Sequence, residues 1–214
     1  MFDKRDIKSP DNAEVRVINF DDMELRVTDD DSPKITGYAA KFGKWSEDLG
    51  GFREKIKPGA FDDVLEDDVR ALKNHDSNLI LGRTTSGTLK LDTNSVGLRF
   101  EIDPPNTSTG KDTIEEIRRK DITGCSFSFT TKTDAWKNNE DGTVERTIVK
   151  VDRLYDVGPV TYPAYPDTTV AARSLDKFKE TEKIEEPAEI DKKEIERGYR
   201  KAGRIINRIK SADV

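Results

Sequence analysis

The chain has 214 residues, of which 37% are charged and 33% hydrophobic, and its formal net charge at pH 7 is -6. This composition supports one core of moderate size, and the acidic excess disfavours a surface that follows nucleic-acid phosphates. A single cysteine, Cys125, excludes an internal disulfide, and no clustered cysteines and histidines indicate zinc. No segment has the apolar length of a signal peptide or a membrane span. We therefore expect a cytoplasmic protein with no metal, cofactor, membrane or nucleic-acid partner.

Alternating apolar and polar residues predict strands through the first three quarters of the chain. The expected strands cover residues 14–20, 23–29, 34–43, 69–74, 79–84, 87–93, 96–103, 123–136 and 143–165. Short Asp-containing breaks separate the first three, which predicts an opening meander. The last two flank "KNNEDG", whose Asp-Gly ending is typical of a hairpin.

Two helices are expected among these strands. In residues 57–67, Pro58 and Gly59 precede apolar residues at helical spacing. Residues 106–122 begin with capping candidates and place Ile114 and Ile117 on one face. The predicted fold class is thus α+β and mainly β.

Near residue 175 the sequence becomes mostly charged, with apolar residues at helical spacing only toward its end. We predict a flexible N-terminus over residues 1–13, one domain over 14–175, a charged linker over 176–188 and a helical tail over 189–214. A helix of this length is marginal in isolation. The tail is therefore either solvated or docks on a partner.

The only histidine, His75, lies at the end of a predicted strand and could be a hydrogen-bonded structural side chain. In "DITGCSFSF", strand alternation directs Cys125 and both phenylalanines to one face and Ser126 and Ser128 to the other. The phenylalanines are expected in the core. The two serines either face water or present a nucleophile.

A serine hydroxyl needs a base to act as a nucleophile near neutral pH, and free imidazole titrates near ~6.5. His75 is the one imidazole available. The base in turn needs an acceptor that orients it, and in this chain the candidates are carboxylates. Asp156 stands in an otherwise apolar strand, where an unpaired charge is costly. Asp76 is the rival, although its position next to His75 favours pointing away or capping a turn.

Six blocks of the sequence, in order from about residue 35 to 173, resemble the tailed-phage (caudovirus) prohead serine protease family. They are "GYAAKFG", "IKPGAFDDVL", "KNHDSNLILGRTTSGTLKL", "VGLRFEIDPP", "DITGCSFSF" and "LYDVGPVTYPAYPDTTVAAR". The resemblance implies a fold akin to herpesvirus assemblin, an antiparallel β-barrel with flanking helices. It also implies peptide-bond hydrolysis inside the immature capsid.

The resemblance places the family's histidine on His75 and its nucleophile on Ser126. Ser128 stands where relatives often have glycine. Asp156 stands where many relatives have glutamate, so its reach is shorter by one methylene. The implied catalytic residues are His75, Ser126 and Asp156, with Cys125 a core residue, which disfavours a cysteine protease.

The expected function is a serine endopeptidase that cleaves the phage major capsid protein or scaffold, and itself, inside the prohead in the bacterial cytoplasm. Self-association during assembly is also expected. The alternative is a non-catalytic structural or scaffolding component in which His75 and Ser126 are only packed side chains. Hydrogen-bond reach between these two side chains separates the alternatives. A zinc hydrolase is disfavoured because one histidine and no paired ligand motif are present.

Overall fold

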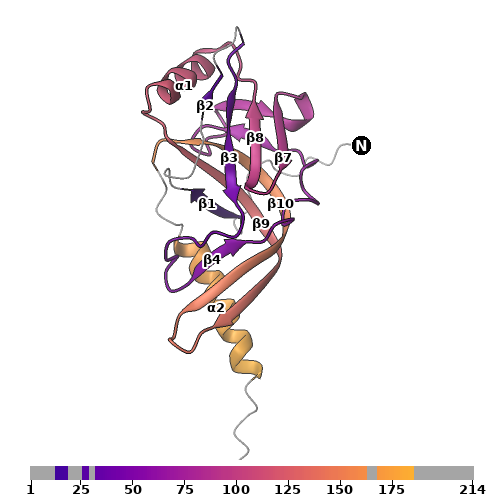
Figure 1. Ribbon diagram of the computed structural model, residues 1–214, viewed down its shortest axis with the longest axis vertical. Coiled ribbons are helices and arrows are strands. Elements are labelled where there is room, and N and C mark those ends of the chain that lie inside the picture. The colour runs from indigo at the N-terminus through magenta and orange to yellow at the C-terminus, as the bar shows by residue number, and fades with distance from the viewer. Residues whose placement is uncertain (1–12, 19–25, 29–31, 163–167, 186–214) are drawn as a thin grey trace, which may run out of the picture. The chain divides into compact units, whose positions relative to one another are not determined.

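The computed structural model describes residues 13–18, 26–28, 32–162 and 168–185 (Figure 1). The chain divides into two compact units, Met1–Leu175 and Asp176–Val214. Most of the predicted N-terminal segment and the whole predicted tail, 189–214, lie outside the described residues. Nothing in the described part is a helix long and apolar enough to cross a membrane.

Strands are the predominant regular structure in the described part of the first unit, which confirms the mainly-β prediction. The strands are β1 (Glu14–Ile18), β2 (Arg26–Val27), β3 (Ile35–Lys41), β4 (Arg53–Ile56), β5 (Arg70–Leu72), β6 (Ile80–Arg83), β7 (Leu89–Thr93), β8 (Gly97–Ile102), β9 (Gly124–Asn138) and β10 (Val144–Val160). The helices are α1 (Ser108–Arg118), α2 (Thr168–Glu185) and a short 3-10 turn, η2 (Thr84–Ser86).

The strands form two sheets. A six-stranded sheet has the order β1-β9-β10-β5-β6, with β4 also paired to β10, and a four-stranded sheet has the order β2-β3-β8-β7. The β9–β10 hairpin closes at Gly142, whose φ of 82° needs the left-handed region that glycine adopts freely. The predicted hairpin is therefore confirmed.

The predicted topology differs from the structure in three respects. Among the described residues the strands form two sheets and no closed barrel. They are also not all antiparallel, because the long β10 pairs in parallel with β4 and, farther along, with β5. The opening meander is absent as well, since β1 pairs with β9 whereas β2 pairs with β3 in the other sheet. Strand alternation predicts strands but not their partners, and these errors concern the partners.

Helix α1 agrees with its prediction. The Thr107 hydroxyl accepts a hydrogen bond from Gly110 N–H at 3.3 Å, as an N-cap does, and Ile117 is buried in the core with Ile114 packed against it. The predicted helix over 57–67 is wrong, because these residues form successive turns. The Ala60 carbonyl, which a helix would use internally, instead accepts a hydrogen bond from the Val151 N–H of β10 at 2.9 Å.

Two elements were missed. Strand β4 is too short for a clear alternation. Helix α2 extends through residues 176–185, which the sequence analysis assigned to a linker. Leu175, within this helix, is 5% exposed, so it buries an apolar side chain where the charge-rich sequence gave little indication of one.

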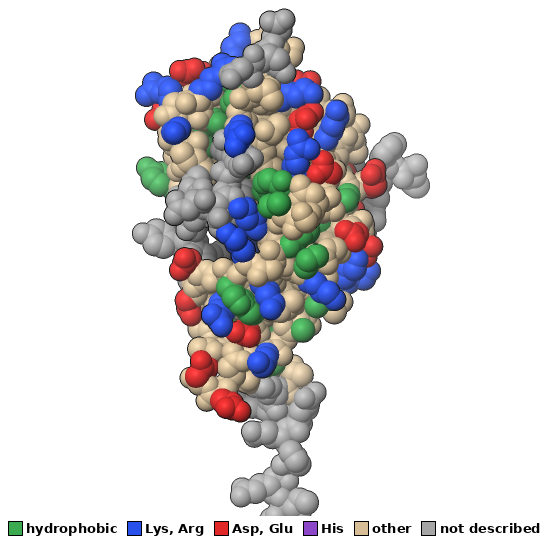
Figure 2. Space-filling model, in the orientation of Figure 1, with side chains coloured by type: hydrophobic (Ala, Val, Ile, Leu, Met, Phe, Trp, Pro, Cys, Tyr) green, Lys and Arg blue, Asp and Glu red, His purple; other side chains and the backbone are tan. Residues whose placement is uncertain are grey.

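The hydrophobic core draws on both sheets. Phe100 and Ile102 of β8 join Phe127 and Phe129 of β9, whose rings stack at a centroid distance of 5.0 Å. On the face drawn in Figure 2, basic and acidic side chains are interspersed rather than gathered by sign. Many of the charged residues thus lie on the surface, and the apolar residues form one core.

Candidate active site

Four neighbouring strands of the six-stranded sheet bring the candidate residues together. Ser126 lies on β9, Asp156 on the adjacent β10, and His75 follows the end of β5, which pairs with β10. On the other side of β9, Arg16 of β1 contributes a backbone carbonyl. The order of the strands therefore places these four residues side by side across the sheet, from His75 through Asp156 and Ser126 to Arg16.

The His75 ring bridges the other two candidates. Its Nδ1 atom lies 2.5 Å from Asp156 Oδ1, and its Nε2 atom lies 2.6 Å from Ser126 Oγ. When Nδ1–H donates a hydrogen bond to the carboxylate, Nε2 has a lone pair that is directed at the serine hydroxyl. This geometry can transfer the hydroxyl proton to the ring and stabilise the resulting cation.

A β-bulge directs Asp156 toward the histidine. In the β9–β10 register Leu154 is opposite Phe129 and Asp156 is opposite Ser128, so two steps along β10 match one along β9. Regular alternation would put Asp156 on the same face as Leu154, which is buried in the core. The extra residue re-aims the carboxylate, as bulges commonly do near functional sites.

Both serines of "CSFSF" are buried, with Ser126 0% and Ser128 1% exposed. The alternative in which they merely face water is therefore wrong. The structure does separate the two, because the His75 contact is made by Ser126, whereas Ser128 is the cross-strand partner of Asp156.

His75 has an unusual backbone. Asn74 and His75 have φ values of 55° and 56°, and the Asp76 N–H donates to the Lys73 carbonyl at 3.0 Å. Two successive positive φ values closed by such a bond are the features of a type I′ turn, in which the second central residue is usually glycine. A histidine there is strained and requires support from its surroundings.

Asn74 supplies part of that support. Its N–H donates to the Pro159 carbonyl at 3.0 Å, its side-chain Nδ2 donates to Thr161 Oγ1 at 3.1 Å, and its Oδ1 accepts from Thr161 N–H at 2.8 Å. These bonds attach the turn to the end of β10. Gly158 lies opposite Ser126 in the register and permits the close approach of β10 to the end of β5. A Cβ atom at this position would collide with the Leu72 carbonyl.

The rival candidates have other partners. Asp76 is exposed, and its carboxylate accepts from the N–H and the side-chain amide of Asn78 at 2.8 and 2.9 Å, so it caps the turn. Cys125 lies in the core, and burial raises the pKa of its thiol, which makes it a poor nucleophile. Among the residues that the structure describes, no group of three or more potential ligands converges on a metal position.

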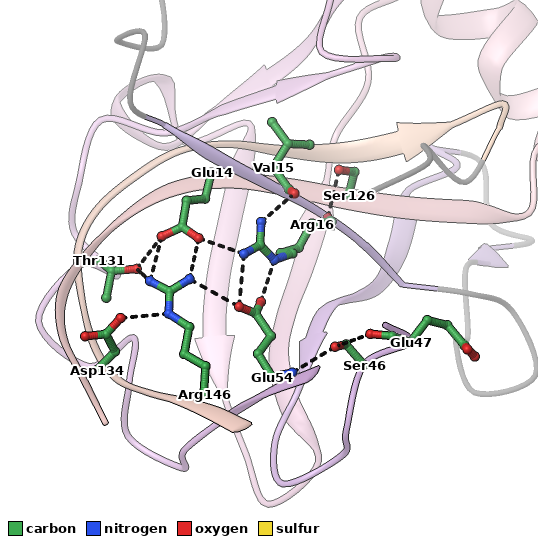
Figure 3. Close-up of polar contacts among 10 residues, drawn as sticks. All are labelled: Glu14, Val15, Arg16, Ser46, Glu47, Glu54, Ser126, Thr131, Asp134 and Arg146. Atoms are coloured by element: carbon green, nitrogen blue, oxygen red, sulfur yellow. Dashed lines mark hydrogen bonds and ion pairs between the residues drawn. The ribbon is translucent and has the colours of Figure 1, made fainter. Parts of the chain in front are cut away.

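The surroundings of Arg16 were not predicted from the sequence (Figure 3). Its side chain donates to Glu54 at 2.5 and 2.9 Å and to Glu14 at 2.7 Å, and Arg146 donates to Glu14 at 2.9 Å and to Glu54 at 3.2 Å. All four side chains are less than 8% exposed. We call these four residues the buried charge network.

The network ties β1 to the rest of the sheet. Glu14 and Arg16 belong to β1, Glu54 to β4 and Arg146 to β10. Burial alone would raise the pKa of Glu14, but the hydrogen bond and charge of Arg146, with the charge of Arg16, outweigh it and lower that pKa to about 2. Charged residues at alternate positions of a strand were the available signal, but they are also typical of a solvated face.

Comparison with known proteins gives one family. The description "Caudovirus prohead serine protease" matches residues 21–183, which include β2 to β10 and all three candidate residues. No match was found among curated proteins or among solved structures. The matched span is more than half of the chain. The chain therefore belongs to the caudovirus prohead serine protease family.

Proposed function

We propose that this protein is a serine endopeptidase that cleaves capsid or scaffold precursors, and itself, inside the prohead. The observation that carries the proposal is the His75 ring within 2.6 Å of both Ser126 Oγ and Asp156 Oδ1. Family membership supports the class of reaction and a location in the phage prohead, within the bacterial host. Self-association during assembly is part of the same proposal.

In the proposed mechanism, His75 Nε2 takes the proton of Ser126 as Oγ attacks the scissile carbonyl. Asp156 accepts a hydrogen bond from His75 Nδ1–H throughout, which fixes the ring orientation and stabilises the imidazolium. The imidazolium then protonates the leaving amine, and the acyl-enzyme forms. A water molecule, deprotonated by His75, hydrolyses the acyl-enzyme and regenerates the serine.

The scaffolding alternative predicts no particular relation between His75 and Ser126. A 2.6 Å contact, on a strained turn that holds the ring in place, favours the protease. A histidine with a purely structural role does not require hydrogen bonds to a serine hydroxyl at one ring nitrogen and to a carboxylate at the other.

The test is co-expression of the full chain with the capsid and scaffold proteins of the phage that encodes it. Cleavage of those proteins should occur with the natural chain and disappear with Ser126→Ala. Ser128→Ala is the matched control, because it removes a hydroxyl of equal burial from the same strand. We expect this control to keep a measurable part of the activity; full cleavage by Ser126→Ala would refute the proposal.

A further inference from the structure

Strand β1 covers the candidate nucleophile. Strand β9 lies between β10 and β1, and β1 ends the sheet on that side. Val17 pairs with Ser126 and Val15 with Ser128. Ser126 has no exposed surface. The family match begins at residue 21, after β1, so the covering strand lies outside it.

The contact also competes for the serine proton. Ser126 Oγ donates to the Arg16 carbonyl at 2.8 Å, and His75 Nε2 lies 2.6 Å from the same oxygen. A hydroxyl has one hydrogen, so it cannot donate fully to both acceptors. While β1 is in place, the proton that the base must remove has a second acceptor (Figure 3).

The buried charge network can be divided into two halves that each contain both signs of charge. Glu14 and Arg16 of the network lie on β1, and Glu54 and Arg146 lie on the remainder, where Arg146 also donates to Asp134 at 2.7 Å. Each pair also has an internal hydrogen bond, at 2.7 Å in β1 and at 3.2 Å in the remainder. Each charge therefore keeps a partner when β1 separates. An unpaired buried charge is the usual large cost of breaking a buried ion pair, and this separation avoids it.

We propose that the edge of β9 covered by β1 is the docking edge for the substrate, and that an extended substrate segment displaces β1 and pairs with β9 beside Ser126. The occupant is inferred from β1 itself, which shows that an extended chain fits there with a peptide carbonyl 2.8 Å from Ser126 Oγ. Main-chain pairing at a sheet edge is a common way to bind peptides. This inference rests on the proposed function and adds the binding mode.

The native cysteine offers a reversible test. Ile18 is the cross-strand partner of Cys125, so Ile18→Cys places two cysteines directly opposite each other, at a separation that a disulfide can span. Oxidation would lock β1 onto β9, and reduction would release it. The control is Ile18→Cys combined with Cys125→Ser, which cannot form the bond.

The readout is phosphonylation of Ser126 by a fluorophosphonate, in the full chain. Oγ attacks phosphorus, fluoride leaves, and His75 takes the serine proton. We expect labelling of the oxidised Ile18→Cys chain to fall to the level of Ser126→Ala and to return on reduction, with no redox effect in the control. Equal labelling before and after reduction would overturn the proposal, as would failure of the two cysteines to cross-link in the folded protein.

Substrate docking is tested in the Ser126→Ala chain, mixed with the phage scaffold protein and followed by amide hydrogen exchange. The β1 amides should lose protection while the β9 amides keep it. Unchanged β1 protection with scaffold bound would exclude displacement. Failure of the proposed function looks different, because the natural, reduced chain would then neither react with fluorophosphonate nor cleave any partner.

Discussion

The strained turn at His75 shows how one side chain depends on its neighbours. Its φ of 56° places the ring toward β9 and β10, and the bonds from Asn74 to Pro159 and Thr161 hold that conformation. Residues in sparsely populated backbone regions cost about 1–3 kcal/mol each and persist where the surroundings impose them. We therefore assign Asn74 the part of a positioning residue.

Asn74→Gly should lower kcat by roughly 10–100-fold with little change in KM, because glycine tolerates the positive φ but removes the side-chain bonds to Thr161. Asn74→Asp should recover part of the rate, since it keeps an acceptor for the Thr161 N–H. The measurement is the rate of scaffold cleavage, with thermal unfolding as a check on stability. Asn78→Ala is the control, because its side-chain amide donates to Asp76 rather than to β10 among the described residues. Equal kcat for Asn74→Gly and the natural chain would exclude the role.

Asp156→Asn tests the orienting carboxylate. The amide has nearly the same shape but favours the wrong tautomer of the ring, so cleavage should slow by about 10²–10⁴-fold. Asp152→Asn, at an exposed position of the same strand, should leave the rate unchanged. A natural rate in Asp156→Asn would mean that the carboxylate only packs against His75.

At the scale of elements, β1 is held by paired charges as well as by its strand pairing. The pKa of Glu14 is lowered from 4.5 to about 2 in the folded protein. Its stabilising contribution is therefore fully present above about pH 4.5 and is lost as the pH falls toward 2. Acid should loosen β1 through this carboxylate.

Glu14→Gln should destabilise the protein near pH 7 by about 1–3 kcal/mol, because Arg16 and Arg146 lose charge-assisted hydrogen bonds to Glu14 but keep those to Glu54. It should also flatten the fall in stability between pH 4.5 and about 2. The measurement is denaturant unfolding as a function of pH. Asp92→Asn, which removes an exposed carboxylate paired with Arg99, serves as the control. Parallel pH profiles for Glu14→Gln and the natural chain would contradict the assignment.

Under the proposed function, the protein must reach the assembling shell before it cleaves its assembly partners. Residues 186–214 contain "IERGYRKAGRIINRIK", in which apolar residues recur at helical spacing. Such a segment can dock on a partner through its apolar face. We propose that it recruits the protein to the assembling shell.

A chain that ends at Glu185 retains α2 and should be incorporated into proheads less efficiently than the full chain. The measurement is its amount in purified proheads by quantitative mass spectrometry, both chains carrying Ser126→Ala so that cleavage does not alter the count. Fluorophosphonate labelling of the truncated chain with Ser126 intact should stay unchanged. Equal incorporation of the truncated and full chains would refute the recruitment proposal without contradicting the assignment of the candidate active site.

Local sequence determined much of this protein. Alternation predicted most of the described strands, capping residues predicted α1, and the single imidazole restricted the choice of base to His75. These features depend on residues near one another in the chain, where side-chain type and spacing directly control the backbone.

Which strands become neighbours depends on contacts between residues far apart in the chain. Arg16 and Ser126 are 110 residues apart, and His75 and Asp156 are 81 apart. The bulge that re-aims Asp156 and the pairing of β1 with β9 follow from long-range packing: an apolar core, and a buried carboxylate and guanidinium that find their partners on other strands. Sequence periodicity reports which face of a strand is buried but not what buries it, so the pairing of β1 beside Ser126 could not be predicted.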